Sequence, residues 1–144
     1  MDSKNVMKKQ IIDELLSIVN LDLVAAKESA QSTKSLASSE EFKAESKWDT
    51  RGIEAGYLAG AQERRIREIE LEILSLNNLK NNLLIRESIG IGSLVNTSTG
   101  FYFITPLTGG IKLKLEQKLI RVVSAASPIA KSLINDEAEI IDFS

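Results

Sequence analysis

Two segments within the first 86 residues carry apolar or small side chains in alternating steps of three and four. In the first segment these positions are Ile12, Leu16, Val19, Leu23, Ala26, Ala30 and Thr33. In the second segment they are Gly52, Ala55, Ala59, Ile66, Ile69, Ile73 and Leu76, and the polar Gln62 occupies the remaining position of the series. Such spacing keeps one stripe of a helix facing a partner helix along its whole length. The pattern therefore predicts two long helices that pack through these stripes.

The two stripes fit each other as an antiparallel hairpin within one chain. The best match of side-chain sizes pairs Leu16 with Ile69, and Ala26 with Ala59. Large residues then face large ones near the base and small face small toward a tip at residues 38–48. Several serines are alternative helix caps there, so the second helix begins somewhere in residues 39–49. The same stripes would also serve a helical bundle or a dimer, but we expect a monomeric hairpin.

Residues 87–144 have a different composition. They hold both prolines and five of the eight glycines, among runs of β-branched and aromatic residues. This composition is typical of strands and turns. The expected strands are 91–95, 101–104, 111–115, 119–124 and 139–143, and the expected short helix is 127–134. Ser127 is its expected N-cap and Pro128 its first helical residue. We therefore predict an α+β chain, with a coiled-coil hairpin in residues 1–86 and a small β-containing domain in residues 87–144.

Composition excludes several kinds of chemistry. The chain has no cysteine and no histidine. Disulfides, thiolate nucleophiles and cysteine-ligated metals are therefore excluded, and the usual general base near neutral pH is missing. The net charge of −2 and the absence of a long apolar run argue against a general nucleic-acid binder or a membrane protein. We expect a cytoplasmic protein that is not an enzyme in its own right and holds no metal stably.

Acidic residues and one aromatic residue gather at the expected tip. Glu41, Glu45 and Asp49 lie there together with Trp48, the only tryptophan. Carboxylates on such a tip can share a hydrated Mg²⁺ with a partner protein. The alternative is a solvated turn in which nearby bases compensate the charge, namely Lys43, Lys47 and Arg51. Trp48 either contacts the partner or covers the end of the coiled coil.

Three segments resemble one known family. The stretch ESKWDTR at residues 45–51, followed by GAQERRIREIE at 60–70, resembles the second coiled-coil helix of the Gre-type bacterial transcription elongation factors. VVSAASPIAKSLI at residues 122–134 is similar to a Ser-Pro segment in the C-terminal domain of that family. GSLV at residues 92–95 resembles the first strand of the same domain. The likeness in architecture covers nearly the whole chain, and the specific motifs cover roughly 40 residues.

The resemblance implies an FKBP-like C-terminal domain and RNA polymerase as the partner. Gre-type factors dock that domain at the rim of the polymerase secondary channel and pass the coiled coil down the channel. Two tip carboxylates then help the polymerase to hold a catalytic Mg²⁺, and the polymerase cleaves its own backtracked transcript. On this view Ser127, Pro128 and Ile129 dock on the polymerase. No DNA sequence is recognised directly, and the only cofactor is the Mg²⁺ shared with the polymerase.

The chain also departs from the family pattern. Alignment on the second helix puts Glu45 at the first tip carboxylate but Trp48, which cannot bind a metal, at the second. Asp49 lies one residue further, about 100° around a helix. The family domain continues with further strands after the position of Ile141, so we expect a smaller sheet here. Transcript cleavage, occupation of the channel without cleavage, and a coiled-coil interaction module with another partner all remain open.

Overall fold

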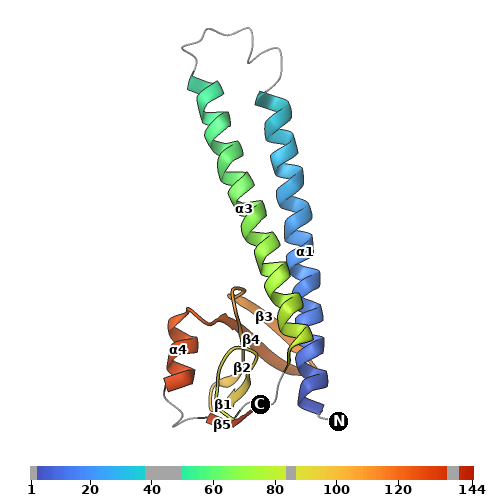
Figure 1. The fold of residues 1–144 in the computed structure, drawn as a ribbon, viewed down its shortest axis with the longest axis vertical. Helices are drawn as coiled ribbons and strands as arrows, with labels where there is room; N and C mark the ends of the chain where they lie inside the picture. Colours follow the sequence, from blue (N-terminus) through green and yellow to red (C-terminus); the bar gives the residue numbers. More distant parts are fainter. Residues whose placement is uncertain (1–2, 38–49, 84–86, 136–139) are drawn as a thin grey trace. The chain divides into compact units, whose positions relative to one another are not determined.

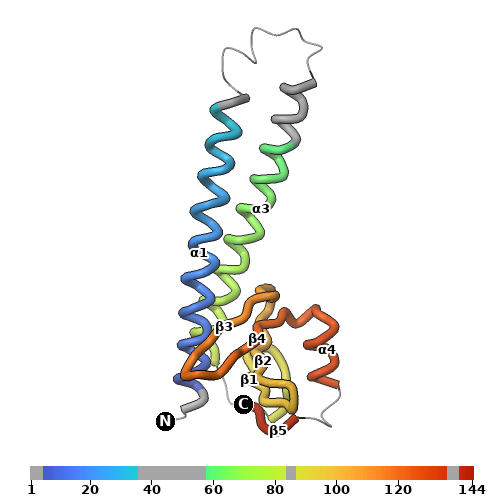
Figure 2. The backbone as a smooth tube through the Cα atoms, turned by 180° about the vertical axis from the view of Figure 1, so that it is seen from behind, coloured from blue at the N-terminus to red at the C-terminus, as the bar shows by residue number. Residues whose placement is uncertain are grey.

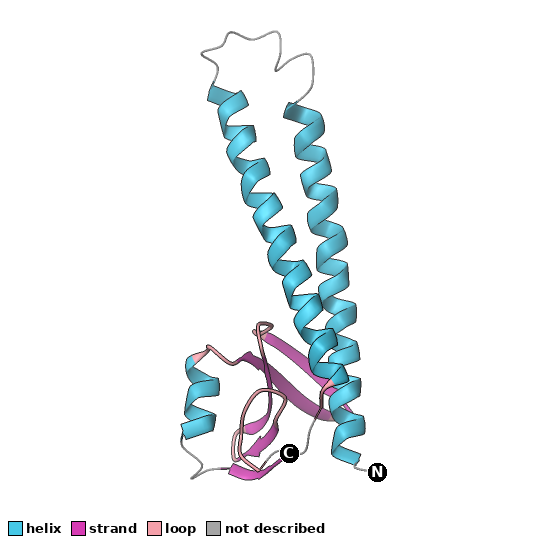
Figure 3. Ribbon diagram, viewed as in Figure 1, coloured by secondary structure: helices cyan, strands magenta, loops and turns pink. Residues whose placement is uncertain are grey.

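The structure is a computed structural model that describes residues 3–37, 50–83, 87–135 and 140–144 (Figure 1). Within these residues, two long helices come first, and five strands and one short helix follow (Figure 3). The elements are α1 (Ser3–Ala37), α3 (Thr50–Asn81), β1 (Leu94–Thr97), β2 (Gly100–Thr105), β3 (Ile111–Leu115), β4 (Lys118–Ser124), α4 (Pro128–Asn135) and β5 (Ile140–Phe143). The prediction of an α+β chain, with a helix pair ahead of a sheet and one short helix, is confirmed.

The five strands form one mixed sheet in the order β3-β4-β2-β1-β5. Neighbouring strands are antiparallel except β2 and β4, which are parallel. The parallel pair arises because β3 lies between them in the sequence and occupies the sheet edge beyond β4. Figure 2 shows the connection between β3 and β4 from behind. β1 begins at Leu94, later than expected, because Ile91 and Gly92 form a turn in which Gly92 has a φ of 90°.

One face of the sheet packs against α4. Val95, Ile104 and Val123 form a buried cluster with Ala130 and Leu133 of α4. The helix starts where the sequence predicted, because the Ser127 hydroxyl oxygen accepts a hydrogen bond from the Ala130 backbone N–H at 3.2 Å. Pro128 follows as the first helical residue, where its missing N–H costs no hydrogen bond.

The opposite face of the sheet is also buried. Leu94 pairs with Phe103, and Phe103 pairs with Val122, so these side chains share one face. Phe103 is completely buried and Val122 is 1% exposed. The first turns of α1 lie over this face, since Val6 and Met7 line a cavity together with Leu94. This face of the sheet is therefore buried by residues of α1 that lie about ninety positions earlier in the chain.

The chain divides into two compact units. The first contains residues 1–17 and 72–144, which means the beginning of α1, the end of α3 and the whole sheet. The second contains residues 18–71, the remaining parts of the two helices. The expected boundary at residues 86 and 87 marks the change from helix to strand, and as a domain boundary it stays a prediction.

The predicted stripes are the buried sides of α1 and α3. Every stripe residue whose burial the structure describes is buried or half-buried, from Ile12 to Thr33 in α1 and from Ala59 to Leu76 in α3. Outside the stripes, Leu21 is 71% exposed and Leu74 is 57% exposed, whereas Ile11 and Leu15 near the start of α1 are also completely buried. The spacing of three and four therefore identified the packing side correctly.

The predicted register between the two helices is wrong. In that register Lys34 would lie level with Arg51, about 18 Å along the axis from Glu63. The structure instead brings the Lys34 ammonium within 3.9 Å of the Glu63 carboxylate. At the base, the Lys80 ammonium lies 2.5 Å from the Asp13 carboxylate, although the predicted register separates these residues by about 12 Å.

A shift of one heptad satisfies both ion pairs. Leu16 then lies level with Leu76, and Leu23 lies level with Ile69. Because the stripes repeat every seven residues, a shift of seven residues leaves the same side of each helix facing its partner. The shifted register keeps large residues together at Leu16 and Leu23 but sets Ile66 against Ala26, so matching of side-chain size favoured the wrong register.

α3 begins at Thr50. The predicted helix start in residues 39–49 and the expected tip at residues 38–48 fall on the segment 38–49, which is outside the described residues. Of the helices that the structure describes, none is long and apolar enough to cross a membrane.

Candidate docking groove

The three residues expected to dock on a partner lie at the start of α4. Ser127 is half-buried, because its hydroxyl donates a hydrogen bond to the Ser124 carbonyl at 2.7 Å and also caps the helix. Pro128 is exposed, and Ile129 has 49% of its surface exposed. Ser127 thus has a structural role, while Pro128 and Ile129 present apolar surface to solvent.

Pro128 and Ile129 form one wall of an apolar groove of about 480 Å³. The opposite wall comes from β3 and the loop before it, with Ile111 and Gly110. β4 also lines the groove, with Val122 and Val123 among its residues. Gly109 lets the loop pack tightly on β4, since a Cβ at this position would lie 2.9 Å from the Ser124 backbone nitrogen. The groove is therefore built by the fold around α4 and is not a gap between mobile side chains.

The part of the sequence that builds this groove is rich in basic residues. Residues 88–135 contain a single acidic residue, Glu116, although the whole chain has a net charge of −2. The basic residues of the same stretch are Lys112, Lys114, Lys118, Arg121 and Lys131. Lys112 and Arg121 both line the groove. An apolar groove with two basic lining residues suits a partner that carries apolar anchors beside acidic side chains.

Arg121 is held in place by the turn between β1 and β2. Its guanidinium donates a hydrogen bond to the Thr99 carbonyl at 3.0 Å and lies 5.8 Å from the centre of the Tyr102 ring. The Tyr102 hydroxyl is 3.2 Å from the Thr99 hydroxyl. This charge is consequently positioned before any partner arrives, which lowers the entropic cost of binding.

The other predicted site residues are not described. Glu41, Glu45, Trp48 and Asp49 fall within residues 38–49, outside the part of the chain that the structure describes. Among the described residues, no group of three or more acidic side chains could hold a metal ion.

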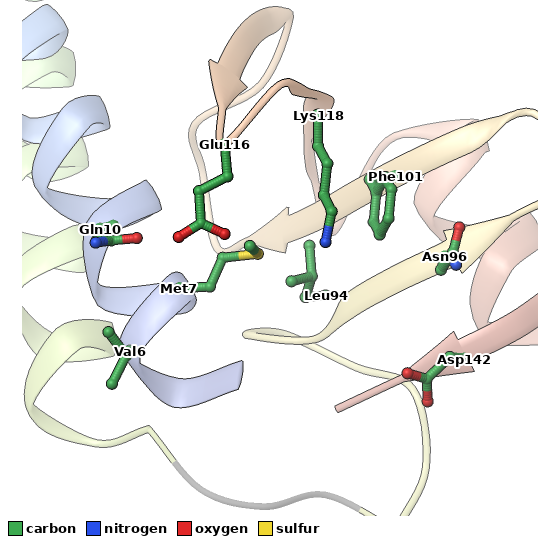
Figure 4. Close-up of a pocket in the computed structure, with 9 residues that line it drawn as sticks. All are labelled: Val6, Met7, Gln10, Leu94, Asn96, Phe101, Glu116, Lys118 and Asp142. Atoms are coloured by element: carbon green, nitrogen blue, oxygen red, sulfur yellow. The ribbon is translucent and has the colours of Figure 1, made fainter. Parts of the chain in front are cut away.

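The structure also contains a cavity that sequence reasoning missed. It has a volume of about 510 Å³ and lies between the first turns of α1 and the sheet (Figure 4). Met7 of α1, Phe101 of β2 and Lys118 of β4 are among its lining residues. No local motif signals this cavity, because its walls come from segments about ninety residues apart.

No protein-family model, no curated protein and no solved structure matches this chain.

Proposed function

We propose that this protein is a Gre-like factor that binds RNA polymerase at its secondary channel and modulates transcript elongation. The groove at the start of α4 docks on the polymerase, and the helix pair enters the channel with its tip. Acidic tip residues, first Glu45 and Asp49 and then Glu41, act on the Mg²⁺ of the polymerase. The protein itself is not an enzyme, and it works in the cytoplasm as a monomer.

One observation carries this proposal. The residues that resemble the docking segment of the family, Ser127 to Ile129, lie together on an exposed apolar groove with two basic lining residues. The helix pair supports the proposal as well, because the stripes of α1 and α3 are buried against each other within one chain. Its ion pairs, Lys80 with Asp13 and Lys34 with Glu63, join the two helices of a single molecule. A helix pair closed on itself needs no second copy to bury its stripe.

Stalled, backtracked elongation complexes test the proposal. Purified protein is added with Mg²⁺, and cleavage at the 3′ end of the transcript is followed for the wild type and for Glu45→Ala and Asp49→Ala. Faster cleavage that either variant loses identifies a cleavage factor and its carboxylates. No cleavage, combined with competition against an authentic Gre factor, identifies a regulator that only occupies the channel.

Docking is tested separately with a matched pair of variants. Ile129→Ser removes an apolar side chain from the groove, whereas Ile141→Ser removes one that is 68% exposed on β5, outside the groove. We expect Ile129→Ser to weaken polymerase binding about tenfold or more, as for an interface anchor, and Ile141→Ser to leave it unchanged. Absence of any polymerase binding by the wild type would refute the proposal and leave an interaction module with another partner.

A further inference from the structure

The cavity beneath α1 has an apolar wall and three charged lining residues, the acids Glu116 and Asp142 and the base Lys118. The wall consists of Val6, Met7, Leu94 and Phe101. Glu116 belongs to the turn between β3 and β4, and Lys118 is the first residue of β4. Figure 4 shows Glu116 near Gln10 and Met7 of α1, and Lys118 beside Phe101. The volume of about 510 Å³ lies within the range of small-molecule sites.

The position of each charge has a structural cause. Glu116 and Gln117 form the two-residue turn of the hairpin, with φ values of 49° and 66°. Positive φ is costly for residues other than glycine, and such turns are kept where the surrounding fold requires them. The Lys118 ammonium lies 5.3 Å from the centre of the Phe101 ring, and this contact keeps the charge beside the apolar wall.

Glu116 and Lys118 do not neutralise each other. In the described part of the chain neither side chain takes part in an ion pair, although only one residue separates them in the sequence. Asp142, the second acid of the lining, takes part in another interaction. Glu116 and Lys118 thus offer a carboxylate and an ammonium to a molecule that carries both charges. The apolar wall between α1 and the sheet offers a surface for an apolar group on that molecule.

We propose that this cavity binds a free α-amino acid with an apolar side chain. The ammonium of the ligand pairs with Glu116, its carboxylate pairs with Lys118, and its side chain packs on Met7, Leu94 and Phe101. Met7 suits this role because an unbranched thioether adapts to ligands of different shape. The site is open to solvent at its rim, so its selectivity depends on both charges being engaged together. This inference does not depend on the polymerase proposal.

A methyl NMR titration tests the inference on the full chain. The sequence has two methionines, Met1 and Met7, so a ¹³C-methionine-methyl spectrum contains two signals, and Met7→Leu assigns them. L-phenylalanine is the probe, and we expect a saturable shift of the Met7 signal. Phenethylamine and 3-phenylpropanoate each lack one of the two charges, and we expect each to bind about tenfold more weakly or worse, as for loss of one charge-assisted contact.

Charge variants complete the test. We expect Glu116→Gln and Lys118→Gln each to weaken L-phenylalanine binding about tenfold, because each removes one ionic contact. Glu87→Gln and Lys112→Gln are the matched controls, since neither residue lines the cavity, and they should bind like the wild type. A Met7 signal that does not move saturably overturns the proposal. So does equal binding of the singly charged probes, or unchanged binding in both cavity variants.

Discussion

Replacement of Gln62 by leucine should stabilise the helix pair. Gln62 occupies a stripe position of α3, where apolar side chains predominate, and it is half-buried. Its side-chain carbonyl oxygen is buried and accepts no hydrogen bond from the residues that the structure describes. A buried acceptor without a partner keeps its full desolvation penalty, about 1–3 kcal/mol. Leucine removes this penalty and is a better residue for a coiled-coil seam.

The expected gain is about 2 kcal/mol in the free energy of unfolding. This value combines the lower part of the desolvation penalty with about 1 kcal/mol from burial of part of a leucine side chain, because the site is only half-buried. For a chain of this size, such a gain raises the unfolding midpoint by about 5 °C. Thermal and urea unfolding, followed by circular dichroism at 222 nm, measure it.

Gln31→Leu is the matched control. Gln31 is exposed on α1, so the same substitution there should change stability by less than about 0.5 kcal/mol. Light scattering at the protein concentrations used for unfolding checks that neither variant dimerises. If Gln62→Leu is no more stable than Gln31→Leu while both stay monomeric, the reasoning about the unpaired oxygen is refuted.

Three further predictions concern the helix register, the cap of α4 and the hairpin turn. The chain has no cysteine, so a double variant with Leu23→Cys and Ile69→Cys should form an intramolecular disulfide under mild oxidation, whereas one with Leu23→Cys and Gln62→Cys should not. The mobility of each variant on a gel, with and without reductant, measures disulfide formation. The opposite result would restore the register predicted from the sequence. Ser127→Ala should destabilise the sheet unit by about 1 kcal/mol through loss of the N-cap, with Ser132→Ala on the exposed side of α4 as a neutral control in urea unfolding. Gln117→Gly should stabilise the chain by about 0.5–1 kcal/mol, because glycine adopts a φ of 66° without strain; an unchanged or lower unfolding midpoint would contradict this.

Local patterns predicted the elements of this fold well. Ser127 and Pro128 predicted the start of α4, because an N-cap and a proline at the first helical position act within the first helical turn. The alternating residues 111–115 likewise predicted β3, since alternation reflects a strand with one solvated face. The stripe from Ile12 to Thr33 predicted the side of α1 that packs on α3, because residues three and four apart lie on the same side of a helix.

Features that depend on distant parts of the chain could not be predicted in the same way. The register of the helix pair is ambiguous by one heptad, and the ion pair of Lys80 with Asp13 selects one answer. The parallel pairing of β2 with β4 depends on where β3 is placed, which no local pattern encodes. The cavity beneath α1 joins Met7 to Lys118, and only the folded chain brings these residues together.

The two edge strands give the sheet different protection against unwanted strand addition. β3 carries exposed Lys112 and Lys114, and a strand approaching this edge would have to bury their charges. β5 is only four residues long, and its pairing with β1 is irregular between Asn96 and Thr97. A short, irregular edge offers few hydrogen bonds in register to another chain. Neutralisation of the two lysines, for example by acetylation, would therefore remove the protection of β3 alone and direct any aggregation to that edge.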